Sequence, residues 1–506
     1  MKKIISVLAF LFTFVSAFSC KPDNRPGEVH GTVSYRDREV ADIVVSYTGD
    51  NGTYTYTTNK SGYYVIRGIP AGDYIVSVSY NGKNVDSYLK DYEKSENPSR
   101  VTILVNGYHV RNIIIPNDQD LGWDDDDDDE DDEDDTTLPD AEIPILAWYS
   151  IPAAYATAER FQELKDCGFT LSFSHTTTQE EAITTLDCAE QAGIKVIVPC
   201  PEANTEAFVQ AVKDKPALYG YCLRDEPKTE ELAGLGEWAD RILALDSEHN
   251  IYFNLFPNYV GDEALGSTYE EYVKQSIQKV KSNQVSFDFY PIRETGIVTS
   301  WWENLEIVKK YSQEADLPFW AFALCTSHKP YPIPELSHLR LQMYMNLAYG
   351  AQGLQYFTYW CPTPGTWDFH DAPIAEDGTP TEVYDLVQEM NDELQARAGV
   401  FMGCKVTGVY QTGDHQPNGT SPLTGYNPPL SRLNLNGGEA TVSFFENGKW
   451  AYLMLVNRSY QAEYDYSIIF EKDVQMVNRD GSVENIGTSL DSHMEAGDCA
   501  IFRWKK

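Results

Sequence analysis

Eight short apolar runs recur between residues 143 and 399, and they restrict the fold of this chain more than any other feature of its sequence. They begin near Ile143, Phe169, Ile194, Leu218, Ile251, Val285, Phe319 and Gly353. Successive starts lie 24 to 34 residues apart, and the stretches between them place apolar residues at helical spacing. Because continuous apolar runs are typical of parallel strands buried on both faces, the pattern predicts a closed (β/α)8 barrel. A doubly wound open sheet is the alternative, disfavoured because no glycine-rich phosphate loop follows the first run.

The remaining sequence divides into four further segments around the barrel, which we place at 141–399. The sequence predicts an export leader at 1–20, a small β domain at 28–116, an acidic linker at 117–140 and a second β domain at 400–506. A chain of 506 residues is expected to contain about three domains. The predicted fold class is therefore multidomain, with a β-sandwich on either side of the barrel.

The first 20 residues have the composition of a secretory signal peptide. Lys2 and Lys3 precede the apolar stretch 4–18, and Ser19 and Cys20 follow it. A cysteine directly after a small residue resembles the lipobox of bacterial lipoproteins. That resemblance implies a lipid on Cys20, and hence a protein anchored in the outer membrane, at the cell surface of a Gram-negative bacterium. The alternative is ordinary cleavage, with Cys20 as a bystander.

Residues 28–116 alternate apolar and polar positions between tight-turn sequences such as Asn51-Gly52 and Asn81-Gly82. Their spacing, from Gly31-Thr32-Val33 through Ser61-Gly62-Tyr63 to Pro70-Ala71-Gly72, resembles the carboxypeptidase-regulatory-like, transthyretin-like β-sandwich. The resemblance implies a spacer without catalytic residues. Strand-like runs and an Asn447-Gly448 turn in 400–506 resemble the β-sandwich that follows many glycosidase barrels.

The charge of the chain limits its partners. The net charge is −38, and the unbroken acidic run 124–135 supplies 12 of those negative charges. Such a surface repels nucleic acid, so we expect no nucleic-acid partner and contact with a membrane only through the lipid anchor. The acidic run reads as a solvated linker, with a calcium-binding tether as the alternative. No cysteine has metal-binding spacing, and we expect neither a metal nor another cofactor.

The fourth run ends in Arg224-Asp225-Glu226-Pro227, and catalytic groups in such barrels lie at the C-terminal ends of the strands. Glycosidic cleavage requires an acid that protonates the leaving oxygen, and Glu226 is the candidate. Pro227 disfavours the helical conformation for Glu226 and so constrains how its carboxyl group is presented. The alternative is that Arg224 forms a structural ion pair with Asp225 or Glu226.

The Asp-Glu-Pro ending resembles two groups of barrel glycoside hydrolases. In the large retaining clan the fourth strand ends in Asn-Glu and the seventh in a nucleophilic Glu, whereas here Asp225 replaces the Asn. The seventh run ends in Ser327-His328 without a carboxylate. In the substrate-assisted N-acetylhexosaminidases of families 20 and 123, an Asp-Glu pair closes the fourth strand. That resemblance implies Glu226 as acid/base and Asp225 as the group that orients a 2-acetamido substituent.

Asp288 and Tyr290 end the sixth run on one face of the strand. In the substrate-assisted interpretation, Tyr290 binds the acetamido oxygen. In a two-carboxylate interpretation, Asp288 is the nucleophile or base opposite Glu226. Asp288 as a hydrogen-bonded scaffold residue is the third alternative.

Further strand-end residues are candidates for sugar binding, since aromatic rings stack on the apolar faces of sugars. They are Trp148, Tyr149, His175, Arg224, Asn254, His328 and Trp360. Barrel packing is the alternative for the aromatic residues, and a satisfied core position is the alternative for the two histidines.

Three functions stay open from the sequence. The first is a retaining, substrate-assisted glycoside hydrolase that acts on an oligo- or polysaccharide. The second is a two-carboxylate glycosidase using Glu226 and Asp288. The third is a non-catalytic surface glycan-binding lipoprotein that keeps the barrel as a platform. For all three we expect a glycan ligand and other polysaccharide-utilisation proteins at the cell surface as partners.

Overall fold

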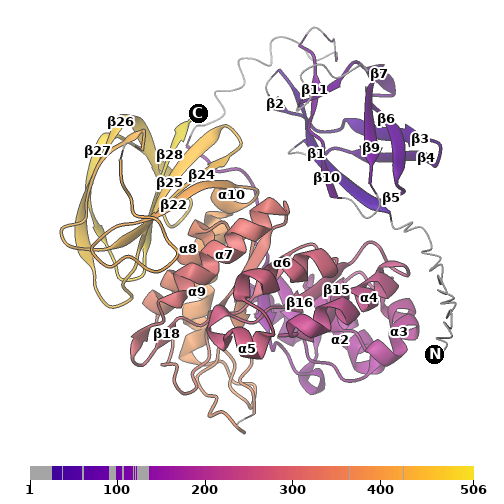
Figure 1. The fold of residues 1–506 in the computed structure, drawn as a ribbon. Helices are drawn as coiled ribbons and strands as arrows, with labels where there is room; N and C mark the ends of the chain where they lie inside the picture. Colours follow the sequence, from indigo (N-terminus) through magenta and orange to yellow (C-terminus); the bar gives the residue numbers. More distant parts are fainter. Residues whose placement is uncertain are drawn as a thin grey trace, which may run out of the picture. The chain divides into compact units, whose positions relative to one another are not determined.

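The computed structural model forms two compact units, one up to Glu133 and one from Asp134 to Lys506 (Figure 1). The residues that it describes are 26–36, 38–59, 62–90, 98–104, 108–117, 119, 121, 136–363, 365–425 and 427–506. The predicted leader with Cys20 and the acidic run 124–135 therefore lie outside the described residues.

The first unit consists of two β-sheets. The strands of one are β1 (Gly27–Tyr35), β2 (Arg38–Glu39), β5 (Tyr63–Ile69), β8 (Tyr88–Leu89), β10 (Tyr108–Val110) and β11 (Ile113–Ile115). Those of the other are β3 (Val44–Gly49), β4 (Gly52–Thr57), β6 (Gly72–Tyr80), β7 (Lys83–Val85) and β9 (Ser99–Ile103). One apolar cluster takes Val29 and Val33 from the first sheet and Val45 and Val76 from the second. Alternating apolar residues thus give each sheet one face that is buried against the other.

The second unit contains the predicted barrel, so the expectation of eight parallel strands is confirmed. The strands are β12 (Ile145–Trp148), β13 (Leu171–Phe173), β14 (Lys195–Pro199), β15 (Leu218–Asp225), β16 (Asn250–Asn254), β17 (Val285–Phe287), β20 (Phe319–Leu324) and β21 (Gly353–Phe357). They pair in parallel from β16 through β12 to β17. A bridge between Leu255 and Phe287 joins the two ends of this sheet and closes the barrel.

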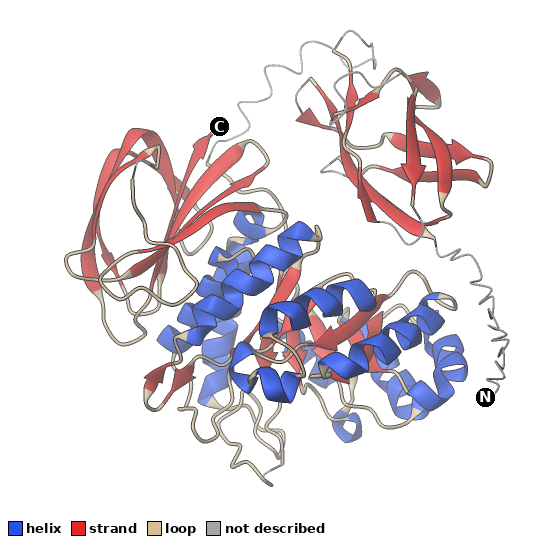
Figure 2. Cartoon of the chain, in the orientation of Figure 1, coloured by secondary structure: helices blue, strands red, loops and turns tan. Residues whose placement is uncertain are grey.

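A helix follows each barrel strand and covers its outer side (Figure 2). The eight are α1 (Ala158–Asp166), α2 (Gln179–Ala192), α3 (Thr205–Val212), α4 (Leu232–Leu243), α6 (Tyr269–Lys279), α7 (Ser300–Glu314), α8 (Leu336–Ala348) and α9 (Glu382–Ala396). Threonine side chains cap several N-termini, and Thr178 forms a capping box with Glu181. The helices therefore begin where the sequence provides an acceptor for their free N–H groups.

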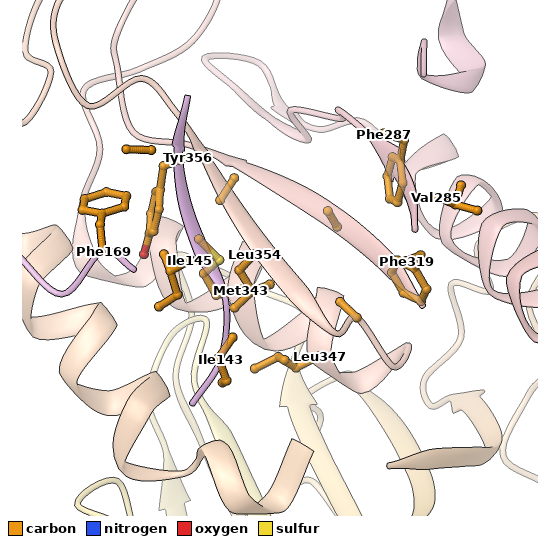
Figure 3. Close-up of a cluster of buried hydrophobic side chains, with 14 of the residues drawn as sticks. Ile143, Ile145, Phe169, Val285, Phe287, Phe319, Met343, Leu347, Leu354 and Tyr356 are labelled. Carbon is orange, nitrogen blue, oxygen red and sulfur yellow. The ribbon is translucent and has the colours of Figure 1, made fainter. Parts of the chain in front are cut away.

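Apolar side chains fill both faces of the barrel wall. Leu146, Phe173, Tyr252 and Phe322 belong to a cluster inside the barrel, so the centre is packed and is not a pore. On the outer side, Figure 3 shows Ile145 and Leu354 from neighbouring strands beside Met343 and Leu347 of α8. Burial on both faces explains why the strands read as continuous apolar runs.

The C-terminal region is one seven-stranded antiparallel sheet, which corrects the expectation of a two-sheet sandwich. Its strands are β22 (Lys405–Gln411), β23 (Leu430–Asn434), β24 (Ala440–Asn447), β25 (Trp450–Asn457), β26 (Tyr464–Val477), β27 (Val483–Met494) and β28 (Cys499–Lys505). The long strand β26 pairs with β23 near its start and with β28 near its end, so one sheet folds around its own core. Along β25, Met454 faces the barrel cluster and Leu453 the inner cluster of the sheet.

Two further properties bear on the sequence predictions. No helix in the described ranges is both long and apolar enough to cross a bilayer. The eight cysteines from Cys167 to Cys499 are free thiols, and six of them are buried. The buried cysteines therefore pack as small apolar residues.

Candidate active site

A β-bulge decides which charged residues at the end of β15 face the barrel opening. Cys222 and Arg224 occupy consecutive paired positions against β16, so Leu223 is an extra residue between them. An extra residue reverses the side-chain direction of everything that follows. Asp225 therefore pairs with Asn254 and shares its interior face. Without the bulge, Asp225 would point outward into the helical layer.

Arg224 points to the outer side and forms an ion pair with Glu231, with 2.9 Å between Nη1 and Oε1. This corrects two sequence-based expectations, because Arg224 pairs with neither Asp225 nor Glu226 and does not face the opening as a sugar-binding residue. Both partners of the pair are exposed, so its contribution to stability is small. The consequence for the site is that the two carboxyl groups are left without their sequence-adjacent cation.

Glu226 has a left-handed backbone conformation, with φ at 50°. Its N–H donates to the carbonyl of Asn254 at 2.9 Å, and the Tyr272 hydroxyl donates to the carbonyl of Pro227 at 2.6 Å. A non-glycine residue in this conformation costs about 1–3 kcal/mol, and such residues gather at functional sites. The two hydrogen bonds and Pro227 thus hold the Glu226 backbone in this conformation and so set the direction in which its side chain leaves the strand end.

Three carboxyl groups meet at this point of the barrel. The Asn254 amide donates from Nδ2 to Oδ1 of Asp288 at 2.9 Å and to Oδ1 of Asp225 at 3.3 Å. Its own oxygen accepts from the Ser286 hydroxyl at 2.9 Å. Glu226 and Asp288 lie close enough to shift each other's pKa. Asp225 is exposed, Glu226 is half-buried and Asp288 is buried, so the cluster is open to solvent on the side of Asp225.

The electrostatics of the cluster suit proton transfer. Burial and the neighbouring charge of Asp225 raise the pKa of Glu226 to about 7. Burial, then Glu226 and Asp225, raise the pKa of Asp288 well above its ordinary value. Within the described part of the chain, no Lys, Arg or His forms an ion pair with any of the three. A pKa of about 7 leaves Glu226 partly protonated near neutral pH, as a general acid requires.

Tyrosines from three loops line the same side of the opening. The Tyr290 ring lies 5.9 Å from that of Tyr331, and burial followed by the charge of Asp288 raises the pKa of Tyr290. Tyr259 is 39% exposed. Partial burial is the largest cause of its raised pKa, and the charge of Asp288 is the second largest. The sequence predictions included Tyr290 and missed Tyr259 and Tyr331. Both residues follow the C-terminal end of a barrel strand, and this position in the sequence could have identified them as candidates.

Trp148 and His175 lie further round the barrel. Trp148 is only 4% exposed and packs 4.3 Å from Phe173 between ring centroids, so it fills the interior. This corrects the expectation of a free sugar platform, because its faces are occupied. His175 is exposed at the rim, 5.1 Å from the Tyr149 ring. Desolvation by the surrounding rings lowers the pKa of His175 to about 4, which leaves it neutral at pH 7.

Tyr149 and Trp360 line a cavity of about 680 Å³ at the ends of β12 and β21. Its wall also contains Tyr155, Glu376 and Asp377. Trp360 is 2% exposed, and its ring lies against Tyr155 at 4.9 Å. Trp360 therefore supports the wall, which corrects the expectation that it offers an open ring face. The volume of the cavity is sufficient for a small ligand.

His328 is buried among aromatic rings, with Tyr331 at 4.8 Å and Phe369 at 4.7 Å. Its Nδ1 lies 3.3 Å from the carbonyl oxygen of Thr326, and burial lowers its pKa. This placement agrees with a satisfied core histidine. Beside it, Trp367 is 53% exposed. No group of three or more His, Cys, Asp or Glu side chains in the described ranges is arranged to hold a metal ion.

Comparison with known proteins supports the fold. No family model matches the sequence, and no curated protein matches it. Among solved structures, a family 42 β-galactosidase from G. stearothermophilus has a TM-score of 0.51 at 9% identity, over 73% of this chain and 99% of that one. A family 39 glycoside hydrolase from Bacteroides cellulosilyticus has a TM-score of 0.45 at 12% identity, over 93% and 98%. An α-L-arabinofuranosidase from Thermotoga maritima has a TM-score of 0.42 at 9% identity, over 74% and 98%.

At these identities the likeness concerns the fold alone, and the fold assignment rests on the family 42 structure. The eight parallel strands of this chain, and the bridge that closes them, independently identify a closed (β/α)8 barrel. The chain therefore has the (β/α)8 barrel fold that is found in a family 42 glycosidase, with a cluster of three carboxyl groups at the C-terminal ends of its fourth and sixth strands.

Proposed function

We propose that this protein is a glycoside hydrolase that acts on an oligo- or polysaccharide, with Glu226 as general acid/base. The observation that carries the proposal is the Glu226 carboxyl group, half-buried at a strand end, with a pKa raised to about 7. In the first step the Glu226 proton moves to the glycosidic oxygen as the bond from that oxygen to the anomeric carbon breaks. In the second step the Glu226 carboxylate takes a proton from water as the water oxygen bonds to that carbon.

The residues at the strand ends favour a substrate-assisted mechanism. Asp225 and Glu226 are adjacent at the end of β15. The residues that follow β20 are Cys325, Thr326, Ser327 and His328, so the seventh strand has no carboxylate at the place where the retaining clan has its nucleophile. Asp225 is exposed and placed to accept the N–H of a 2-acetamido group, whose oxygen bonds to the anomeric carbon as the glycosidic bond breaks and is displaced from it by water in the second step. The Tyr290 hydroxyl, beside Asp288, is placed to donate to that oxygen in the same step.

An inhibitor distinguishes this mechanism from the two-carboxylate alternative. A thiazoline derived from N-acetylglucosamine mimics the cyclised intermediate, and we expect it to compete with substrate only if the acetamido group takes part. Inhibition constants for the thiazoline and for N-acetylglucosamine itself provide the measurement and its matched control. Equal, weak inhibition by both would favour Asp288 as the nucleophile or base. The activity of Asp288→Ala and the anomer of its product would then be measured next. Loss of activity with an unchanged product anomer would support that role for Asp288.

The raised pKa of Glu226 predicts the pH dependence. Glu226 must carry its proton in the first step, so kcat/KM should fall as the pH rises above about 7. Asp225 must be ionised. Although the residue is exposed, the surrounding protein partly desolvates its carboxyl group and raises its pKa, so activity also falls at acidic pH. The Asp225 charge raises the pKa of Glu226. In Asp225→Asn, Glu226 should therefore lose its proton at lower pH, and the residual activity should decline at lower pH than in the wild type. A basic limb that does not move in this variant would contradict the assignment.

The test of the function itself is incubation of the full chain with a panel of host and plant glycans, followed by analysis of released sugars. Binding without release across the panel would instead indicate a non-catalytic glycan-binding protein. The cavity beside Tyr149 is proposed to hold sugars beyond the cleaved bond. Lipidation at Cys20, the outer-membrane location, the spacer role of the first unit and surface partners stay predictions from the sequence.

A further inference from the structure

Arg293 is a cation without an acidic partner among the described residues. It lies in the hairpin of β18 (Ile292–Arg293) and β19 (Gly296–Ile297), which follows the sixth barrel strand. Its side chain is half-buried, and its Nε is buried without a hydrogen-bond partner. It forms no ion pair with any residue that the structure describes. Guanidinium groups have five N–H donors and are normally paired when they are buried, so this group is available to a ligand.

Two tyrosine rings hold the Arg293 guanidinium in place. Its central carbon lies 5.5 Å from the Tyr259 ring centroid and 5.9 Å from that of Tyr331, which is cation–π distance. Tyr331 lies close enough to Tyr259 to raise the pKa of its hydroxyl. Tyr259 also lies close enough to Asp288 and Glu226 for their charges to raise its pKa. Arg293 is thus separated from the carboxyl cluster by one aromatic side chain.

The carboxyl cluster does not use this cation. The pKa of Glu226 is shifted by burial, by Asp225 and by Asp288, and that of Asp225 by burial and Asn254. Arg293 contributes to neither shift. It is therefore not a counter-ion for the reacting groups, yet it borders the same opening.

We propose that Arg293 binds an anionic oxyacid group, a carboxylate or a sulfate ester, on a sugar adjacent to the cleaved bond. A planar guanidinium fork matches both groups through paired, charge-assisted hydrogen bonds. No existing ion pair is lost when such a ligand binds. In a chain with net charge −38, a local cation is also what an anionic glycan needs to overcome general repulsion. The inference rests on the proposed glycosidase function and names its substrate class.

The test compares matched sugars on the full chain by isothermal titration calorimetry at low salt. Glucuronic acid is paired with glucose, and N-acetylglucosamine 6-sulfate with N-acetylglucosamine. The anionic member of at least one pair should bind about tenfold more tightly, as expected for a charge-assisted pair of hydrogen bonds. Arg293→Met should reduce that affinity ratio about tenfold, and Arg293→Lys should retain part of it because the charge stays.

Arg241→Met is the matched control, since it removes one positive charge from an exposed residue of α4. It should leave the ratio unchanged, and melting temperatures of both variants check their folding. A preference for only the uronic acid or only the sulfated sugar identifies the source of the anionic group. The inference is overturned if the wild-type chain binds neither anionic sugar, shows no preference in either pair, or keeps its preference in Arg293→Met. If the chain binds the anionic sugar more tightly through Arg293 but hydrolyses no glycan, the proposed function is wrong and the anion-binding site is still supported.

Discussion

Glu226→Gln is expected to lower kcat/KM on a cleaved glycan by about 10² to 10⁴, the range that general acid–base catalysis contributes. Glutamine has nearly the same shape and cannot donate a proton of comparable acidity. The backbone around it should be kept, because the Glu226 N–H bond to Asn254 and the Tyr272 bond to Pro227 do not involve the carboxyl group. Removing one of three neighbouring carboxyl groups also relieves repulsion, so stability should not fall.

The matched control is Glu230→Gln, four residues further along in an exposed position. It makes the same chemical change outside the cluster and should keep wild-type kinetics. Initial rates on one purified glycan, together with thermal unfolding of all three proteins, separate a catalytic loss from a folding loss. If Glu226→Gln retained more than about a tenth of the activity, a loss well below the general-acid range, another group would have to be the acid.

Glu393→Ala is expected to have the largest effect on stability. Glu393 of α9 forms a bidentate ion pair with Arg340 of α8, and its side chain also accepts from the Tyr344 hydroxyl. Arg397 is 1% exposed and lies 3.7 Å from the same carboxylate. Removing Glu393 takes away the buried carboxylate that both guanidinium groups contact and leaves Arg340 with its exposed partners only, and breaking a buried ion pair typically costs about 3–5 kcal/mol. The free energy of unfolding of the second unit, from urea titration followed by tryptophan fluorescence, is the measurement.

Glu389→Ala provides the control, because Glu389 lies 3.7 Å from Arg340 but its side chain is 54% exposed. An exposed pair is worth about 0–1 kcal/mol, so this variant should unfold close to the wild type. Arg340 also donates to Glu495, which precedes β28, at 2.9 Å. The destabilisation should therefore affect the barrel and the C-terminal sheet in one transition. Equal midpoints for Glu393→Ala and Glu389→Ala would show that the cluster adds nothing to stability.

The sequence predicted what depends on local pattern. Apolar runs at regular spacing mark strands that are buried on both faces, and the observed barrel strands begin within two residues of the predicted starts. Glu226 follows an apolar strand, so its place at the rim follows from the barrel rule. For the same reason Asp288 and Tyr290 could be assigned to the opening from their position after the sixth run.

Long-range placement could not be predicted in this way. Whether an aromatic residue at a strand end is open or packed depends on its neighbours, and Trp148 and Trp360 are packed. Tyr259, Tyr331 and Arg293 come from three separate loops, and their contact has no counterpart in the sequence order. The sequence predicted that the C-terminal region consists of β-strands, but the union of seven strands in one folded sheet depends on the pairing of β26 with both β23 and β28.

The sequence by itself determined the barrel and the carboxyl groups at its rim, because the burial of a strand and the position of its end follow from the local pattern of apolar and polar residues. Only the tertiary structure decided which of those groups face one another. The extra residue Leu223 turns Asp225 toward Asn254 and Arg224 toward Glu231, and a register shift of one residue depends on pairing with the neighbouring strand.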